Sequence, residues 1–153
     1  MARLSALLLC ILFLVTASDV RAQNNWEVGL RFGDNVSIDA TVPFGYAPRL
    51  HAAVYLDRFG VAGYGNWAFN LANAPKNLKF YIGAGPELFF ETRFDFAVAG
   101  DLGAEWVFDQ VPVTVGFDWR PALRLTNGSD FHTGNWGFIA RFMLGRGTFT
   151  SAD

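Results

Sequence analysis

The 153-residue sequence contains one cysteine and two histidines, so it has few side chains for disulfide, thiol or metal chemistry. Charge is also scarce, because Asp, Glu, Lys and Arg make up 17% of the residues and the net charge is −2. No basic cluster is present, so we predict no nucleic-acid partner. We also predict no cofactor and no metal site. Conversely, the 52% content of hydrophobic residues excludes a disordered chain.

The start of the chain has the pattern of an export signal. Arg3 gives a short basic segment, residues 4–15 form an almost unbroken apolar run, and residues 20–22 fit a signal-peptidase site. The apolar run is too short for a membrane-spanning helix. We therefore predict that residues 1–22 are a signal peptide that is removed together with Cys10, leaving a mature chain without cysteine.

After this segment the hydrophobic residues follow a period of two, which is typical of β-strands. Apolar residues alternate with polar or small residues, and turn-forming groups such as Gly33-Asp34-Asn35 separate the runs. Eight strands are predicted, within residues 26–32, 36–44, 50–56, 61–71, 78–90, 94–108, 111–125 and 136–144.

The two faces of these strands differ in composition. One face is apolar on all eight strands and carries most of the Phe and Trp residues, whereas the opposite face combines charged residues with Ala and Gly. The charged face supplies a predicted interior charge network, which consists of Glu27, Arg31, Asp39, Lys79, Glu87, Asp101, Glu105, Asp118, Arg120, Arg124 and Arg141.

The bulk of the aromatic residues indicates which face is inside. The bore of eight strands is too narrow for so many Phe and Trp side chains, but small residues between charges fit a narrow, filled interior. With the apolar face toward lipid, a charge there would cost about 2–4 kcal/mol, and closure leaves no unpaired edge. We predict an all-β fold, an eight-stranded antiparallel up-and-down transmembrane β-barrel over residues 23–145, followed by a tail over 146–153.

In this pattern the chain resembles the small eight-stranded β-barrel outer-membrane proteins of Gram-negative bacteria, of the OmpA and OmpX sort. Asn135, Gly137, Ala140 and Phe142 match the polar-x-Gly-x-x-hydrophobic-x-hydrophobic signal that the barrel-assembly machinery reads in the last strand of this family. The resemblance implies an outer-membrane location, contacts with outer-membrane lipid and that machinery, and a monomer. The chain departs from the family in continuing beyond the final aromatic residue of this strand and in its short outer loops.

The orientation of the family places both chain ends in the periplasm. Pro86 and Pro121 fall within predicted strands, where we expect bulges or positions beyond the bilayer. Only the fourth outer loop has appreciable length. The outer connections are then expected near residues 33–35, 57–60, 91–93 and 126–133, and the inner ones near 45–49, 72–77 and 109–110.

Three functions remain open at this point. We favour a non-enzymatic outer-membrane barrel that contributes to envelope integrity or surface interaction, with its interior charges paired. A lipid-modifying enzyme is the second, because Ser129, Asp130 and His132 supply the residue types that some such barrels use on lipid A. The third is a soluble periplasmic lipocalin-like carrier of an apolar ligand, with the two faces reversed. His51 is interpreted as an interior histidine with satisfied hydrogen bonds.

Overall fold

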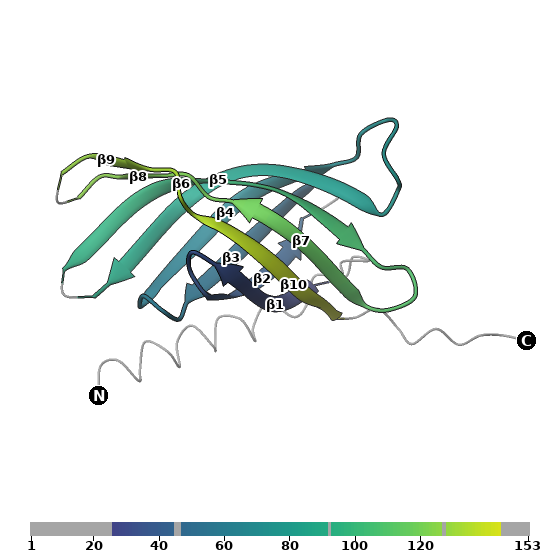
Figure 1. The fold of residues 1–153 in the computed structure, drawn as a ribbon, viewed down its shortest axis with the longest axis horizontal. Coiled ribbons are helices and arrows are strands. Elements are labelled where there is room, and N and C mark those ends of the chain that lie inside the picture. The colour runs from purple at the N-terminus through teal and green to yellow at the C-terminus, as the bar shows by residue number, and fades with distance from the viewer. Residues whose placement is uncertain (1–25, 45–46, 92, 127, 145–153) are drawn as a thin grey trace, which may run out of the picture.

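The computed structural model describes residues 26–44, 47–91, 93–126 and 128–144, which form a closed antiparallel β-barrel of eight strands (Figure 1). The predicted signal peptide and tail lie outside the described residues. Within the described part, no helix has the length and apolar character needed to cross a membrane. The segments are β1 (Trp26–Gly33), β2 (Ser37–Pro43), β3 (Pro48–Tyr55), β4 (Gly60–Phe69), β5 (Leu78–Phe90), β6 (Phe94–Val107), β7 (Val113–Trp119), β8 (Ala122–Arg124), β9 (Asp130–His132) and β10 (Trp136–Leu144).

Strands β1 to β7 pair in chain order, and the ladder between the first and the last strand of the chain closes the ring. β1 pairs with β10 and β5 pairs with β6, so the order β5-β4-β3-β2-β1-β10-β7-β6 closes on itself. Trp26 lies opposite Leu144. The barrel therefore has a terminal rim, where β1 begins and β10 ends, and a distal rim at its other end. The closed strand order confirms the prediction, made from the period-two pattern, of an eight-stranded, up-and-down antiparallel barrel.

The last two strands of the barrel are each divided into two segments near Pro121, which lacks the N–H that a ladder requires. β7 and β8 together form the seventh strand, and β9 and β10 form the eighth. Trp119 pairs with Trp136, whereas Ala122 pairs with His132. The eighth strand thus carries one extra residue between these pairs, so the bulge expected near Pro121 lies in the neighbouring strand.

Pro86 lies inside β5, and the expectation of a bulge there is wrong. The ladder to β4 contains the pair Ala62–Glu87 and resumes at Gly65–Ala84 with no shift in register. The two pairs between them are missing from the ladder, in the place where Pro86 has no N–H to donate. The barrel accommodates this proline by losing ladder pairs rather than by adding a residue.

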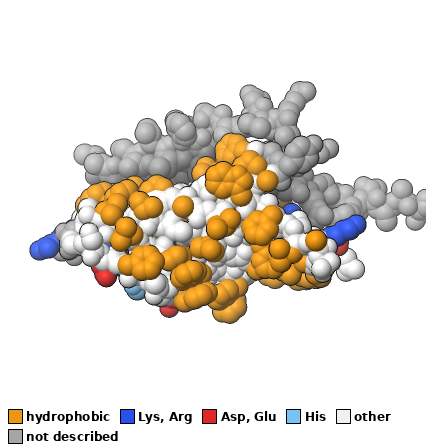
Figure 2. All heavy atoms as spheres, turned by 90° about the horizontal axis from the view of Figure 1, so that it is seen from above, with side chains coloured by type: hydrophobic (Ala, Val, Ile, Leu, Met, Phe, Trp, Pro, Cys, Tyr) orange, Lys and Arg blue, Asp and Glu red, His pale blue; other side chains and the backbone are white. Residues whose placement is uncertain are grey.

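The two faces of the wall are oriented as predicted. Apolar side chains point outward, as in Phe138 at 67% and Trp67 at 58% exposure, whereas Arg31 and Asp101 are fully buried in the interior. Figure 2 shows hydrophobic side chains spread over one side of the wall, with the Lys and Arg side chains that are visible in this view toward its ends. The barrel thus has a polar core and an apolar surface, the reverse of an ordinary globular domain.

Short connections join the strands close to the predicted positions, with two corrections. The predicted fourth outer loop, residues 126–133, contains β9, which pairs with β8 and extends the hairpin beyond a simple loop. Arg49 was expected in an inner connection but belongs to β3, where its side chain is buried. The described connections cover residues 34–36, 56–59, 70–77 and 108–112, together with parts of those after β2, β5 and β8.

Candidate functional site: the charged interior

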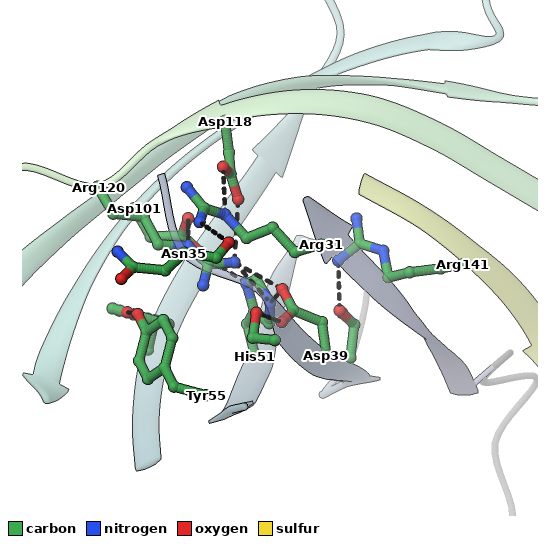
Figure 3. Close-up of polar contacts among 12 residues, drawn as sticks. Arg31, Asn35, Asp39, His51, Tyr55, Asp101, Asp118, Arg120 and Arg141 are labelled. Carbon is green, nitrogen blue, oxygen red and sulfur yellow. Dashed lines mark hydrogen bonds and ion pairs between the residues drawn. The ribbon is translucent and has the colours of Figure 1, made fainter. Parts of the chain in front are cut away.

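The centre of the barrel holds His51 between two carboxylates (Figure 3). Its Nδ1 lies 2.7 Å from Asp101 Oδ2, and its Nε2 lies 2.7 Å from Asp39 Oδ2. An ionised carboxylate only accepts hydrogen bonds, so two such contacts require a proton on each ring nitrogen. The geometry therefore favours a positively charged imidazolium that links β2, β3 and β6. Asn66 adds a bond from its Nδ2 to Asp101 Oδ2 at 2.7 Å.

Arg120 connects His51 and its two carboxylates to Asp118 on β7. Its Nη2 donates to Asp39 Oδ2 at 2.6 Å and lies 2.9 Å from Asp118 Oδ2, while its Nε donates to Asp101 Oδ1 at 3.3 Å. Arg31 Nε donates to Asp118 Oδ1 at 2.7 Å. All of these charged side chains are fully buried. Together with His51 they form one continuous central cluster across the bore.

A second cluster, nearer the terminal rim, is centred on Glu105. Arg49 donates to both of its oxygens, at 2.6 and 3.0 Å, and Arg141 Nη2 donates to Oε2 at 2.6 Å. Arg141 also donates to Thr41 Oγ1 at 2.7 Å and pairs with Glu27, 3.2 Å away. Because Arg49 contacts both oxygens of Glu105, the pair gains a defined orientation in addition to the attraction between the two charges.

A third cluster lies toward the distal rim and contains two tyrosines. The hydroxyls of Tyr55 and Tyr64 donate to the same oxygen of Glu87, at 2.9 and 2.6 Å. The Arg120 guanidinium lies 5.2 Å from the centre of the Tyr64 ring, which joins this cluster to the central one. The three clusters fill successive levels of the bore with hydrogen-bonded side chains.

The buried charges are balanced in number. Among the described residues, four buried arginines and the charged His51 face five buried carboxylates; these are Arg31, Arg49, Arg120 and Arg141 opposite Asp39, Glu87, Asp101, Glu105 and Asp118. Such balance matters because an unpaired charge in a low-dielectric interior costs several kcal/mol.

Small residues provide the space that these long side chains need. A Cβ atom at Gly137 would lie 2.5 Å from the Arg31 guanidinium, and one at Gly83 would lie 1.9 Å from the Asn66 side chain. Glycine at these positions thus leaves room for a large polar side chain of the neighbouring strand. The small residues of the polar face thus make room for the long charged side chains of the same face.

Most of the predicted interior charges take part in these clusters. Arg124 lies apart, because it is one-third exposed and pairs with Asp95 at 3.6 Å. Lys79 is half-buried opposite Glu105 in the β5–β6 ladder. The residues placed in the central cluster are Arg31, Asp39, Asp101, Asp118 and Arg120; Glu27, Glu105 and Arg141 belong to the second, and Glu87 to the third.

Sequence reasoning missed four important members of the clusters. His51 was interpreted as a satisfied interior histidine, which the structure bears out, but not as the bridge between two carboxylates. Arg49 shares the strand face of His51, and this parity could have identified it. Tyr55 and Tyr64 also lie on the polar face of their strands, but a tyrosine there gives no indication of the carboxylate it contacts.

The residues of the predicted assembly signal occupy both sides of the last strand. Asn135 is buried and its side chain accepts a bond from Asn35 at 3.2 Å, while Gly137 makes room for Arg31. Ala140 and Phe142 point outward. Their placement gives Asn135 and Gly137 a packing role, whatever their role in assembly.

The candidate enzymatic residues lie outside the clusters. Ser129, Asp130 and His132 are all exposed near the distal rim, and no hydrogen bond or ion pair within the described chain joins their side chains. The described residues also contain no group of three or more His, Cys, Asp or Glu side chains that could hold a metal ion. No protein-family model matches the chain, and no curated protein or solved structure matches it either.

Proposed function

We propose that the protein is an integral β-barrel of the bacterial outer membrane, without catalytic activity, that contributes to envelope integrity or surface interaction. The observation that carries this proposal is the reversed distribution of polarity, with charged side chains inside and large apolar side chains outside. Water around such a wall would contact a continuous apolar surface far larger than a soluble monomer normally exposes. Lipid around it removes that cost.

The dimensions and the aromatic residues of the wall support the same proposal. Trp26, Trp67 and Trp106 lie toward the terminal rim, and Trp119 and Trp136 lie at the distal rim. On β10, the eight steps between the rims rise about 3.4 Å each along a strand tilted by about 40°, which gives an apolar band roughly 20 Å high. Aromatic belts on either side of such a band are typical of outer-membrane barrels.

The charged clusters favour a closed barrel over a carrier or an open channel. A soluble lipocalin-like carrier needs an apolar interior, whereas buried charges and polar groups outnumber the large apolar side chains Phe89, Ile139 and Met143 in the described interior here. The side chains of Arg120 and His51 span the bore between opposite walls. We infer that the interior serves to hold the wall together rather than to bind a ligand.

Cell fractionation followed by gel electrophoresis tests the membrane location. We expect the protein in the urea-washed outer-membrane fraction, with a mobility that differs between unheated and boiled samples because a closed barrel resists detergent. A deletion strain should become more sensitive to detergents that the envelope excludes. Recovery in the osmotic-shock fluid without a mobility change would overturn the proposal in favour of a soluble carrier.

A double variant, Ser129→Ala with His132→Ala, tests the absence of catalysis. We expect the mass profile of lipid A to be the same in cells that carry this variant, the unchanged protein or no copy at all. A change that depends on the protein and disappears in the variant would instead identify a lipid-modifying enzyme.

A further inference from the structure

One strand edge of the described chain has no neighbour, and it lies along β9 at the distal rim. In the sheet order β9 is the last member and pairs with β8 alone, whereas each of the other described strands has a neighbour on both sides. In Figure 1 the β8–β9 hairpin projects at the upper left, with β9 along its outer side. All three residues of β9 are exposed. A closed barrel normally leaves no such edge, and a free edge is where another strand can pair.

The β8–β9 hairpin is fixed to β6, so the free edge has a defined position. Leu125 N donates to Phe96 O at 2.9 Å, and Phe96 N donates to Thr126 Oγ1 at 2.9 Å. Thr126 Oγ1 in turn donates to Asp95 at 2.5 Å. These bonds continue the barrel wall into the hairpin.

The ladder determines which backbone groups β9 presents at its free edge, because successive residues of a strand bond to alternate neighbours. Pro121 O accepts a bond from β6 at 2.8 Å, so the next alternate residue, Leu123, also faces β6. Ala122 and Arg124 then face β9, where they pair with its third and first residues. The N–H and C=O groups of the middle residue, Phe131, therefore point to the free edge.

The side chains of β9 suit pairing with a second copy of the same strand. In an antiparallel pair centred on Phe131, Asp130 of each copy lies opposite His132 of the other. The carboxylate accepts hydrogen bonds, and an imidazole can donate one in either of its charge states. Within the described chain neither side chain has a hydrogen bond or ion pair of its own. A parallel pair in the same register would instead place like charges opposite each other, which is unfavourable.

We propose that β9 pairs with β9 of a second copy, antiparallel and centred on Phe131. This inference rests on the proposed function and specifies the surface interaction named there. Two antiparallel strands of one sheet are related by a two-fold axis through the sheet, so the two barrels point in opposite directions. Their distal rims face each other, as on two cells whose outer membranes come into contact. The contact is much smaller than the interface of a stable dimer, so it acts through many copies on both surfaces.

Disulfide trapping tests the register of this pair. Asp130→Cys and His132→Cys are prepared separately in the predicted mature chain, which has no cysteine of its own. Each is placed in nanodiscs that hold one barrel, and the two are mixed in equal amounts and oxidised mildly. In the proposed pair the two cysteines lie opposite each other with Cα atoms about 4.5 Å apart, which a disulfide can span.

The mixed pair also keeps one contact between Asp130 of one copy and His132 of the other. The control mixture replaces Asp130→Cys by Asp57→Cys, which is exposed in another connection at the distal rim. The mobility change between unheated and boiled samples verifies that each variant is folded.

We expect about tenfold more cross-linked dimer in the mixture of Asp130→Cys and His132→Cys than in either variant alone or in the control mixture, because the other cysteine pairs lie beyond the reach of a disulfide. Equal amounts in all samples, or none in any, would overturn the proposal. A dimer formed by Asp130→Cys alone would overturn it too, since that product requires a parallel pair.

A charge exchange tests the same contact without cysteines. In sedimentation of the nanodiscs, Asp130→Lys should weaken association about fivefold, because it changes two cross-strand pairs, and Asp130→Lys with His132→Asp should restore it. Equal association of all three proteins would contradict the proposed pairing. Barrels that enter nanodiscs but do not cross-link overturn this inference alone, whereas recovery of the protein in the osmotic-shock fluid overturns the proposed function as well.

Discussion

Arg120 is the residue whose loss should weaken the barrel most. Its guanidinium contacts three buried carboxylates, those of Asp39, Asp101 and Asp118, at 2.6, 3.3 and 2.9 Å. The variant Arg120→Met keeps most of the side-chain volume but removes the charge. Removing one partner of a buried ion pair costs about 3–5 kcal/mol, because the other charge stays buried without compensation. We expect a loss of this size in the free energy of unfolding.

Denaturant unfolding of the vesicle-inserted barrel, followed by tryptophan fluorescence, measures this loss. Arg124→Met is the matched control, since Arg124 is one-third exposed and its pair with Asp95 spans 3.6 Å. A pair of this kind contributes only about 0–1 kcal/mol. If Arg120→Met and Arg124→Met destabilise the protein equally, the interior pairs do not stabilise the barrel in the way we describe.

A second substitution separates charge from packing. Asp118→Asn neutralises one carboxylate near Arg120 and keeps a side chain that accepts a hydrogen bond from Arg31. In the Arg120→Met background it should recover part of the lost stability, with a coupling of about 0.5–3 kcal/mol that residues in one ion-pair network show. No recovery would indicate that packing, rather than unpaired charge, causes the loss.

Three further predictions test other parts of the structure. Gly137→Ala places a Cβ 2.5 Å from the Arg31 guanidinium and should cost about 1–3 kcal/mol in the same unfolding assay; an unchanged stability would contradict the close packing. Val115→Arg puts a charge on the outward face and should cost about 2–4 kcal/mol in vesicles, whereas Val115→Leu should be neutral. If Val115→Arg is tolerated, that face does not meet lipid. Glu87→Gln weakens the bonds from the Tyr64 and Tyr55 hydroxyls and should cost about 1–3 kcal/mol; Tyr55→Phe, which leaves the Tyr64 bond in place, should cost less.

The alternation of residue types predicted the barrel well because each side chain of a strand can point only to the inside or to the outside of the wall. Once the face with Phe138 and Trp67 is assigned to the outside, Arg31 and Asp101 must lie inside. Closure then follows from the need to pair both edges of the sheet. These steps depend on local pattern, which a single sequence displays in full.

The contacts inside the bore could not be predicted in the same way. Whether His51 reaches Asp39 or a more distant carboxylate depends on the stagger between strands, which alternation does not determine. The extra residue opposite Pro121 belongs to another strand, so it is visible only when both strands are aligned. Arg49 directly follows Pro48, which gives no indication of a strand, and its partner Glu105 comes from β6 across the barrel.

The reversed polarity of the molecule explains why its interior contains so many ion pairs and hydrogen bonds between side chains. A soluble domain buries apolar side chains and gains stability as water leaves them, but this wall keeps its apolar side chains on the surface. Its core must therefore be held by directed contacts, and each charged group in it needs partners on other strands. His51 with Asp39 and Asp101 joins three strands in this way. It follows that substitutions in the bore should be tolerated when they preserve both volume and charge balance, whereas outward substitutions should be tolerated whenever they remain apolar.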